Sequence, residues 1–172
     1  ARWENTRRAV ERVKSSNPWL YEEPSGEARQ GFFAGRRIIG RDTPINGGVY
    51  VGSGAREAIV VDDQKYPKEL LDTYRELRIR MAQEQQRSPL NRKTTLQLIA
   101  DLSSEKLGGR ASEAVLETQI AELLTKLTGS PKGVDTREQD IKVALNTFMQ
   151  NKSGVCRHRA LLAGYLMEQL VK

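Results

Sequence analysis

The sequence predicts an α+β fold that is mainly α-helical, with a small antiparallel β-hairpin region near residues 31–63. Two observations predict it. From Pro67 to the C-terminus, apolar residues recur three and four positions apart, which is the spacing of one helix face. Near residues 31–63, short β-branched and aromatic runs alternate with Gly, Pro, Asn and Asp, which is typical of strands and turns. A chain of 172 residues can bury a substantial core.

The chain divides into three segments on these patterns. Residues 1–65 are expected to form an N-terminal helix and a small β subdomain, and residues 66–134 a helical region. Residues 135–172 end in the helix that carries the single cysteine. No linker-like composition separates the segments, so true independence is not indicated.

The N-terminal segment begins with an amphipathic helix over residues 2–15, which Asn17 and Pro18 end because the residue before proline avoids helical geometry. A hairpin turn is expected between Val51 and Ala58, and Asp62-Asp63 ends the last strand. The runs expected to form strands are Phe32-Phe33, Ile38-Ile39, Val49-Tyr50-Val51 and Ile59-Val60-Val61.

The first helix of the middle segment is predicted to begin at Pro67, a favourable first-turn residue, and to fade through the polar residues 83–88 before Pro89. The next helix opens at Thr94 or Thr95. The apolar residues expected to face the core are Leu70, Tyr74, Leu77 and Met81 in the first helix, and Leu96, Ile99, Ala100 and Leu107 in the second.

Gly108-Gly109 ends the second helix, and Ser112 is a suitable N-cap for a third helix that Gly129 closes. Asp135 or Thr136 then caps a fourth helix, which is expected to pack antiparallel to the helix that follows it. The core residues predicted for the third and fourth helices are Leu116, Ile120, Leu123, Leu124, Leu127, Ile141, Ala144, Leu145, Phe148 and Met149.

Residues 152–162 hold the only cysteine and the only histidine, Cys156 and His158. Gly154 is expected to end the preceding helix, because glycine tolerates the left-handed conformation. Small and apolar residues then recur at helical spacing, which predicts a helix from Cys156 to the C-terminus. The residues of this stripe, after Cys156, are Ala160, Ala163, Gly164, Met167, Leu170 and Val171.

A thiol in the first turn of a helix lies near unpaired backbone N–H groups and the positive end of the helix dipole. Together with Arg157 and Arg159, these features favour the nucleophilic thiolate of Cys156. A cysteine on an apolar stripe is also typical of a small buried hydrophobe. Two positions along a helix is a rotation of about 200°, so His158 points away from the thiol and a structural role is favoured.

Residues 154–160, Gly-Val-Cys-Arg-His-Arg-Ala, resemble the nucleophile segment of the transglutaminase-like superfamily, where Gly-x-Cys opens a helix. The Cys-Arg-His-Arg-Ala run is similar to one branch, which includes bacterial domains and the domain ahead of the kinase in some plant Raf-like kinases. The resemblance covers residues 135–172. It implies a papain-like Cys-His-Asp site with Cys156 as the catalytic nucleophile. It also implies that Gly154, Arg157, His158 and Arg159 belong to the motif.

In that superfamily the histidine and the aspartate lie on strands after the cysteine helix, whereas this sequence ends at Lys172. The chain is therefore expected to be the N-terminal part of a truncated transglutaminase-like domain. The sheet that would follow is expected to cover the helix near Ala160, Ala163, Gly164 and Met167. Without that cover, the chain should self-associate through this C-terminal helix or cover it with its own N-terminal segment.

Two classes of function follow. The first is a thiol acyltransferase or an amide or peptide hydrolase, acting on a protein or peptide substrate and incomplete in this chain. The second is a regulatory or protein-interaction domain that keeps the fold without catalysis. Whether the chain is an enzyme stays open between the two. No pattern calls for a cofactor or a metal.

Composition limits the partners. Lys plus Arg number 28 against 22 Asp plus Glu, a net charge of +6, but the charges are mixed and no aromatic platform accompanies them. Nucleic acid is therefore a disfavoured partner. No apolar run approaches the roughly 18 residues of a membrane span. One cysteine excludes an internal disulfide and suits a reducing compartment, so a cytoplasmic location is the default expectation.

Overall fold

The computed structural model describes residues 44–51, 57–128 and 142–172, together with Arg8, Glu11 and three two-residue strands that precede them. The predicted helix over residues 2–15 otherwise lies outside the described residues; Arg8 and Glu11 are both helical. The elements are β1 (Tyr21–Glu22), β2 (Phe32–Phe33), β3 (Arg36–Arg37), β4 (Gly48–Val51), β5 (Ala58–Val61), α2 (Lys68–Arg87), α3 (Arg92–Lys106), α4 (Glu113–Thr128), β6 (Lys142–Ala144), α6 (Leu145–Gln150) and α7 (Cys156–Leu170).

The described fold is α+β and mainly helical, as predicted. Strands β4 and β5 form the predicted antiparallel hairpin, with Gly48 opposite Val61. The turn that joins them and the predicted Ile38-Ile39 run lie outside the described residues. Strands β1, β2 and β3 form a second antiparallel sheet. Unexpectedly, β6 adds to β5 in parallel, with Ile59 opposite Val143, so the sheet of β4, β5 and β6 is mixed rather than purely antiparallel.

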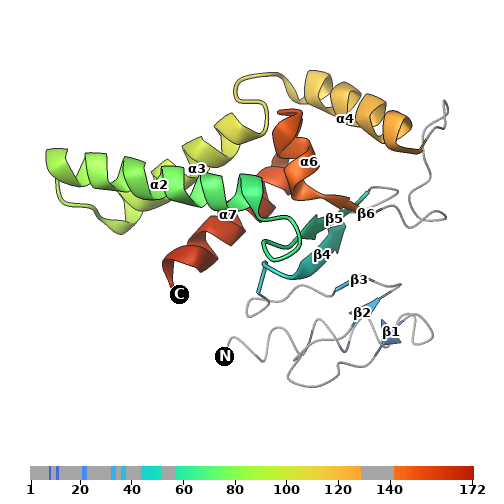
Figure 1. The fold of residues 1–172 in the computed structure, drawn as a ribbon, viewed down its shortest axis with the longest axis horizontal. Coiled ribbons are helices and arrows are strands. Elements are labelled where there is room, and N and C mark those ends of the chain that lie inside the picture. Colours follow the sequence, from blue (N-terminus) through green and yellow to red (C-terminus); the bar gives the residue numbers. More distant parts are fainter. Residues whose placement is uncertain are drawn as a thin grey trace.

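Helices α2, α3 and α6 pack around α7 beside this mixed sheet. In Figure 1, α2 runs away from the sheet and α3 crosses behind α2 on the way back, and the two helices contact each other. Helix α7 packs most extensively against α3 and also touches α2, α6 and β5. The shared core joins sheet and helix residues and includes Tyr50, Ile59, Leu77, Leu102, Phe148, Leu162 and Tyr165.

The boundaries of α2 and α3 differ from the predicted ones. Helix α2 begins after Pro67, as expected, but continues through the polar residues 83–87 to Arg87. Glu, Gln and Arg are good helix formers, and a segment that projects past the core needs no apolar face. Helix α3 begins at Arg92, not at Thr94, because the side chain of Asn91 accepts a hydrogen bond from the Thr94 backbone N–H at 2.9 Å.

The core faces of these helices are partly as predicted. Leu70, Leu77, Ile99 and Leu107 are buried, but Leu96 is exposed. Ala100 is also exposed. Two glycines end the segment after α3 as expected, with φ of 111° at Gly108 and 61° at Gly109.

Helix α4 follows Ser112, whose hydroxyl accepts from the Val115 N–H at 3.4 Å, as an N-cap should. Leu116 and Ile120 are buried, whereas Leu127 is 54% exposed. Gly129, the caps Asp135 and Thr136, and Ile141 all lie outside the described residues.

The predicted fourth helix is confirmed over Leu145–Gln150, with Leu145, Phe148 and Met149 buried, but is wrong for the residues just before it. Residues 142–144 form β6, and the helix begins only at Leu145. Ala144 satisfies the helical spacing of Leu145, Phe148 and Met149 by coincidence, because the backbone at this point pairs with β5. Helix α6 has 6 residues, and the main partner of α7 is α3 instead.

Helix α7 spans Cys156–Leu170, as predicted, but its predicted face is rotated. Cys156 and Ala160 are exposed, and Met167 is 40% exposed. Ala163 is half-buried, and Gly164 faces Ile45. The residues that α7 buries are His158, Leu161, Leu162, Tyr165 and Leu166. Cys156, Ala160 and Met167 therefore lie on the outer side of the helix, because His158 and Tyr165 find polar partners inside the protein.

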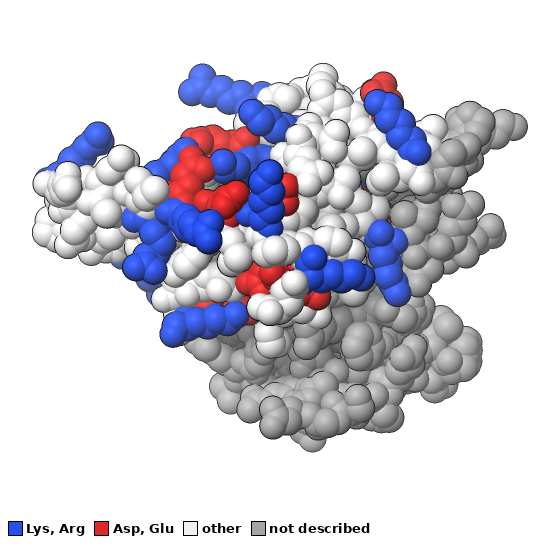
Figure 2. Space-filling model, in the orientation of Figure 1, with Lys and Arg blue, Asp and Glu red and all other residues white. Residues whose placement is uncertain are grey.

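Charged side chains of both signs alternate over α2 and α3 on the face shown in Figure 2. Arg80 bridges Glu76 on its own helix and Glu105 on α3, at 2.8 and 2.7 Å. Lys106 also pairs with Glu76. Arg80 of α2 and Lys106 thus belong to a mixed surface of paired charges. Within the described residues, no helix has the length and apolar character needed to cross a membrane.

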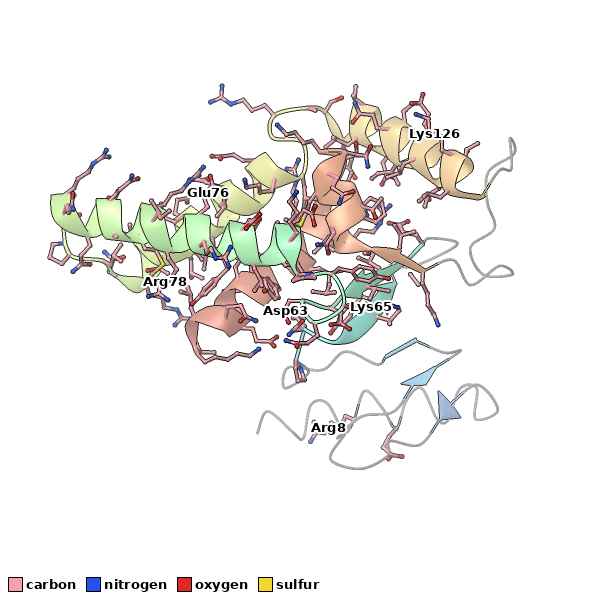
Figure 3. The ribbon with its side chains drawn as sticks, viewed as in Figure 1. Arg8, Asp63, Lys65, Glu76, Arg78 and Lys126 are labelled. Atoms are coloured by element: carbon pink, nitrogen blue, oxygen red, sulfur yellow. The ribbon has the colours of Figure 1, made fainter. Side chains whose placement is uncertain are left out.

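The turn between β5 and α2 is built on two aspartates, as predicted. The Asp62 carboxylate accepts from the backbone N–H groups of Gln64 and Lys65, which closes a local turn. Asp63, labelled in Figure 3, is buried and contacts other elements. Its partners lie on α7 and in the loop before β4.

Candidate functional site

Cys156 is the first residue of α7, and its side chain is exposed. Val155, an extended residue, precedes it as the N-cap. The thiol therefore lies at a helix N-terminus, where backbone N–H groups lack helical partners. The predicted position of Cys156 is confirmed, and the alternative of a buried structural cysteine is not what the structure shows.

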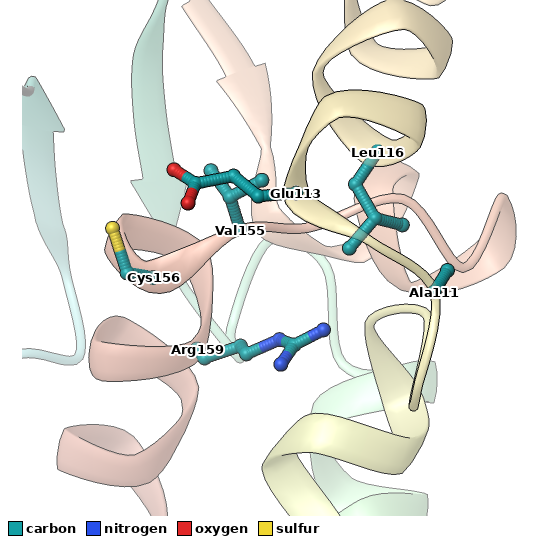
Figure 4. Close-up of a pocket in the computed structure, with 6 residues that line it drawn as sticks. All are labelled: Ala111, Glu113, Leu116, Val155, Cys156 and Arg159. Atoms are coloured by element: carbon teal, nitrogen blue, oxygen red, sulfur yellow. The ribbon is translucent and has the colours of Figure 1, made fainter.

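A pocket of about 210 Å³ lies beside the thiol, between the start of α7 and the start of α4 (Figure 4). In Figure 4, the carboxylate of Glu113 and the sulfur of Cys156 point to the same side of the pocket. The guanidinium of Arg159 points to the opposite side. The remaining residues that line the pocket are Ala111, Leu116 and Val155. The thiol is thus accessible from a small pocket that carries one acidic and one basic side chain.

The residue after the thiol, Arg157, is held in an ion-pair network. Its Nε donates to Glu57 Oε1 at 3.1 Å, and its Nη1 donates to Glu117 Oε1 at 2.9 Å. Glu57 immediately precedes β5 and is 1% exposed, whereas Glu117 lies on α4 and is 40% exposed. The positive charge that the sequence places next to Cys156 is therefore shared with two carboxylates.

His158 is fully buried and has a partner on each ring nitrogen. Its Nδ1 accepts from the Val155 backbone N–H at 3.1 Å, and Nε2 lies 2.8 Å from Glu57 Oε1. Because Nδ1 accepts, the neutral ring carries its proton on Nε2 and donates it to Glu57. The ring also packs on Phe148, with centroids 4.3 Å apart. His158 is thus a satisfied structural residue directed away from Cys156, as its spacing predicts.

Burial and hydrogen bonding together set the charge states of His158 and Glu57. Burial lowers the pKa of His158 below its ordinary 6.5, and the attraction of Glu57 offsets this only in part. Burial raises the pKa of Glu57, but hydrogen bonds from His158 and Arg157 outweigh that effect and bring it below 4.5. At neutral pH the network therefore holds an ionised Glu57, an ionised Arg157 and a neutral His158.

The two remaining motif residues fix the loop before α7. Arg159 donates to the carbonyl oxygens of Gly154 and Gly109, at 3.2 and 3.1 Å. Gly154 is needed for close packing: a Cβ there would lie 2.7 Å from Leu107 Cδ2 and 2.9 Å from His158 Cβ. The left-handed residue of this connection is Lys152, with φ of 47°, so the expected conformational reason for Gly154 is wrong.

The far end of α7 is anchored to a different set of residues. Tyr165 donates its hydroxyl hydrogen to Asp63 at 2.9 Å, and Asp63 also accepts from the side chain of Asn46. Glu168 accepts from the backbone N–H of Ile45 at 2.6 Å. The loop before β4 therefore holds the second half of the helix.

The five predicted site residues lie within one short segment of the sequence, residues 154–159, but they make different contacts in the structure. Only Cys156 and Arg159 line the pocket. Sequence reasoning missed Glu57 and Glu113. The sequence held one signal for Glu57, which is a charged residue directly before a run expected to form a strand. Its partners Arg157 and His158 lie far downstream in the sequence. Among the described residues, no group of three or more His, Cys, Asp or Glu side chains could hold a metal ion.

Comparisons of the chain with models of protein families, with curated proteins and with solved structures find no match.

Proposed function

We propose that this chain carries the nucleophile of a transglutaminase-like thiol acyltransferase or amide or peptide hydrolase, with Cys156 as the attacking group. The observation that carries the proposal is the exposed thiol on the first residue of α7, beside a pocket. This position combines access for a substrate with the positive end of a helix dipole. The resemblance of residues 154–160 to the superfamily's nucleophile segment supports the same role.

In the proposed reaction, the Cys156 sulfur bonds to the substrate carbonyl carbon while its proton passes to a base. The tetrahedral oxygen takes the charge, and the backbone N–H of Cys156 is a candidate donor to it. The C–N bond then breaks, and the amine leaves with the proton. Water or a second amine attacks the thioester and restores the thiol. The base must be a group other than His158, because both nitrogens of His158 are already bonded.

That same commitment of His158 favours a second candidate, a non-catalytic regulatory or protein-interaction domain that retains the fold. The chain has one histidine, and it is used to hold Glu57 and Val155. In this second function, Cys156 is an accessible but unused thiol.

Thioester trapping distinguishes the two. The protein is incubated with an activated acyl ester, and peptide mass spectrometry then locates any acyl adduct. The catalytic proposal predicts an adduct on Cys156 that water or added methylamine removes, and none in Cys156→Ala. Glutathione at the same concentration is the control for ordinary thiol acylation. An adduct that forms no faster than on glutathione, and that methylamine leaves in place, supports the non-catalytic domain.

A further inference from the structure

One carboxylate, that of Glu57, contacts the two residues that directly follow the pocket thiol of Cys156. Glu57 Oε1 accepts from Arg157 Nε and from His158 Nε2, and Glu57 Oε2 lies 3.4 Å from Arg157 Nη2. Glu57 immediately precedes β5, about a hundred positions earlier in the chain, and strands β4 and β6 pair with β5 on its two sides. The first turn of α7 is thus tied to the middle strand of the mixed sheet.

The three side chains of this connection are buried, so its loss is costly. The side chains of Glu57, Arg157 and His158 are 1%, 11% and 0% exposed. If Glu57 lost its charge, the imidazole N–H would lose its ionised acceptor, and the largely buried guanidinium would keep only Glu117 as a carboxylate partner. Loss of a buried carboxylate partner destabilises a buried cation, so the first turn would have to move to rehydrate Arg157. Such a movement would also shift Cys156, which immediately precedes Arg157.

His158 extends the same connection to the backbone. Its Nδ1 accepts the N–H of Val155, the N-cap residue directly before Cys156. Glu57 orients the imidazole from the other nitrogen, which fixes the tautomer that can accept at Nδ1. Glu57 therefore acts on both sides of the thiol: on Val155 through His158, and on Arg157 directly.

We propose that Glu57 is a positioning residue for Cys156, which fixes the first turn of α7 through Arg157 and His158 and so sets the direction and access of the thiol. This inference rests on the proposed function of Cys156. Glu57 acts through other residues and not on the substrate.

Glu117 is a matched control. It is the same residue type and binds the same guanidinium, but from α4 and with 40% of its side chain exposed. The comparison of Glu57→Gln with Glu117→Gln therefore separates a buried anchor from a surface ion pair. Neither residue lines the pocket.

The test combines amide hydrogen exchange with the alkylation rate of Cys156 by iodoacetamide in the wild type and both variants. In Glu57→Gln, the Val155 and Arg159 amides should exchange roughly tenfold faster or more relative to the amides of Tyr165 and Leu166 in the same helix. The alkylation rate should change by about threefold or more, whereas Glu117→Gln should stay within about twofold of the wild type. Exchange that rises equally along α7, or not at all, overturns the proposal.

A measurement on the wild type applies even if Glu57→Gln fails to fold. The chain has one histidine, so a long-range ¹H–¹⁵N spectrum shows a single imidazole. At pH 7 the proposal requires a neutral ring with its proton on Nε2. A ring protonated on Nδ1, or one that interconverts between tautomers, would mean that Glu57 does not hold His158 and would overturn the proposal.

The thioester experiment distinguishes failure of this inference from failure of the proposed function. If the first turn loosens in Glu57→Gln but wild-type Cys156 forms no labile adduct, the anchor is supported and the proposed function fails. If the wild type forms the adduct and a loosened Glu57→Gln forms it equally fast, the proposed function stands and the positioning role is wrong.

Discussion

The two ends of α7 are held in different ways. At the start, a buried carboxylate, Glu57, pairs with a guanidinium and an imidazole on consecutive residues. Toward the end, Asp63 accepts from a neutral phenol, Tyr165, and from an amide, Asn46. Both anchors are buried carboxylates, but Glu57 pairs with a cation, whereas Asp63 is held by neutral donors. Removal of Glu57 leaves a largely buried guanidinium with one carboxylate fewer, whereas removal of the Tyr165 hydroxyl leaves Asp63 with its bond from Asn46. The thiol is therefore carried by the end that an ion pair holds.

Among the substitutions that test this difference between the two ends of α7, removal of Glu57 should change the free energy of unfolding most. Glu57→Ala leaves Arg157 and His158 without their common acceptor, and we expect it to lower the free energy of unfolding by about 3 kcal/mol. Urea denaturation followed by circular dichroism measures this difference. Glu117→Ala, the exposed counterpart, should cost less than about 1 kcal/mol. Equal losses for the two variants would contradict the distinction between a buried and an exposed partner of Arg157.

Tyr165→Phe tests the other end of the helix. It removes the hydroxyl that donates to Asp63 but keeps the buried ring, so we expect a loss of about 1.5 kcal/mol in the same denaturation experiment. Asp63 keeps its bond from Asn46, which limits the loss. A cost greater than that of Glu57→Ala would reverse the proposed order of the two ends.

Acid should weaken the thiol-bearing end first. In the unfolded chain His158 takes up a proton near its ordinary pKa of 6.5, whereas burial keeps its pKa lower in the folded protein. The unfolded state therefore binds more protons, and stability falls as the pH drops below about 6.5. Glu57, whose folded pKa is lowered, adds a further loss as the pH falls through that lowered value.

Denaturation at pH 7 and pH 5 measures this dependence, with His158→Gln as the comparison. The wild type should be less stable at pH 5, and the variant should show a smaller difference between the two pH values. Protonation of His158 would also place an N–H on Nδ1 opposite the donating Val155 N–H. Stability that rises toward pH 5 in the wild type would rule out a buried neutral histidine.

The smallest effect on the fold is expected on the outer face of α7. Met167 is 40% exposed and Val171 is 85% exposed, so Met167→Glu should change the unfolding free energy by less than about 0.5 kcal/mol. If this face mediates self-association, the charge should weaken the dimer. Light scattering over a wide concentration range tests both proteins. A wild type that remains a strict monomer contradicts the self-association hypothesis.

Local sequence patterns predicted the positions of helices better than they predicted which side of a helix is buried. Helix α7 was predictable because Gly154 precedes a run of helical spacing that continues to Leu170. Its rotation was not, because its buried side includes His158 and Tyr165. Their polar atoms are satisfied by Glu57 and Asp63, each about a hundred residues earlier in the chain. A one-dimensional pattern records that a residue is polar, not whether a distant segment supplies its partner.

Strand β6 shows the same limit for secondary structure. Residues 142–144 continue the spacing of the helix that follows, and nothing local marks them as a strand. They are extended because β5 offers them a parallel partner. The residues of the candidate site also divide into those that a local pattern predicts and those that only tertiary contacts place. Cys156 and its place at a helix start were predictable, whereas Glu57 and Glu113 join the site only through the tertiary fold.

The most direct test of the central claim is the alkylation of Cys156 by iodoacetamide in the native wild-type protein, compared with the urea-unfolded protein and with glutathione. An exposed thiol at an anchored helix start should be modified in the native state at least as fast as glutathione, and no slower than in the unfolded chain. Modification that requires unfolding would show that the thiol is shielded. That result would contradict both the exposure of Cys156 and its proposed role as a nucleophile.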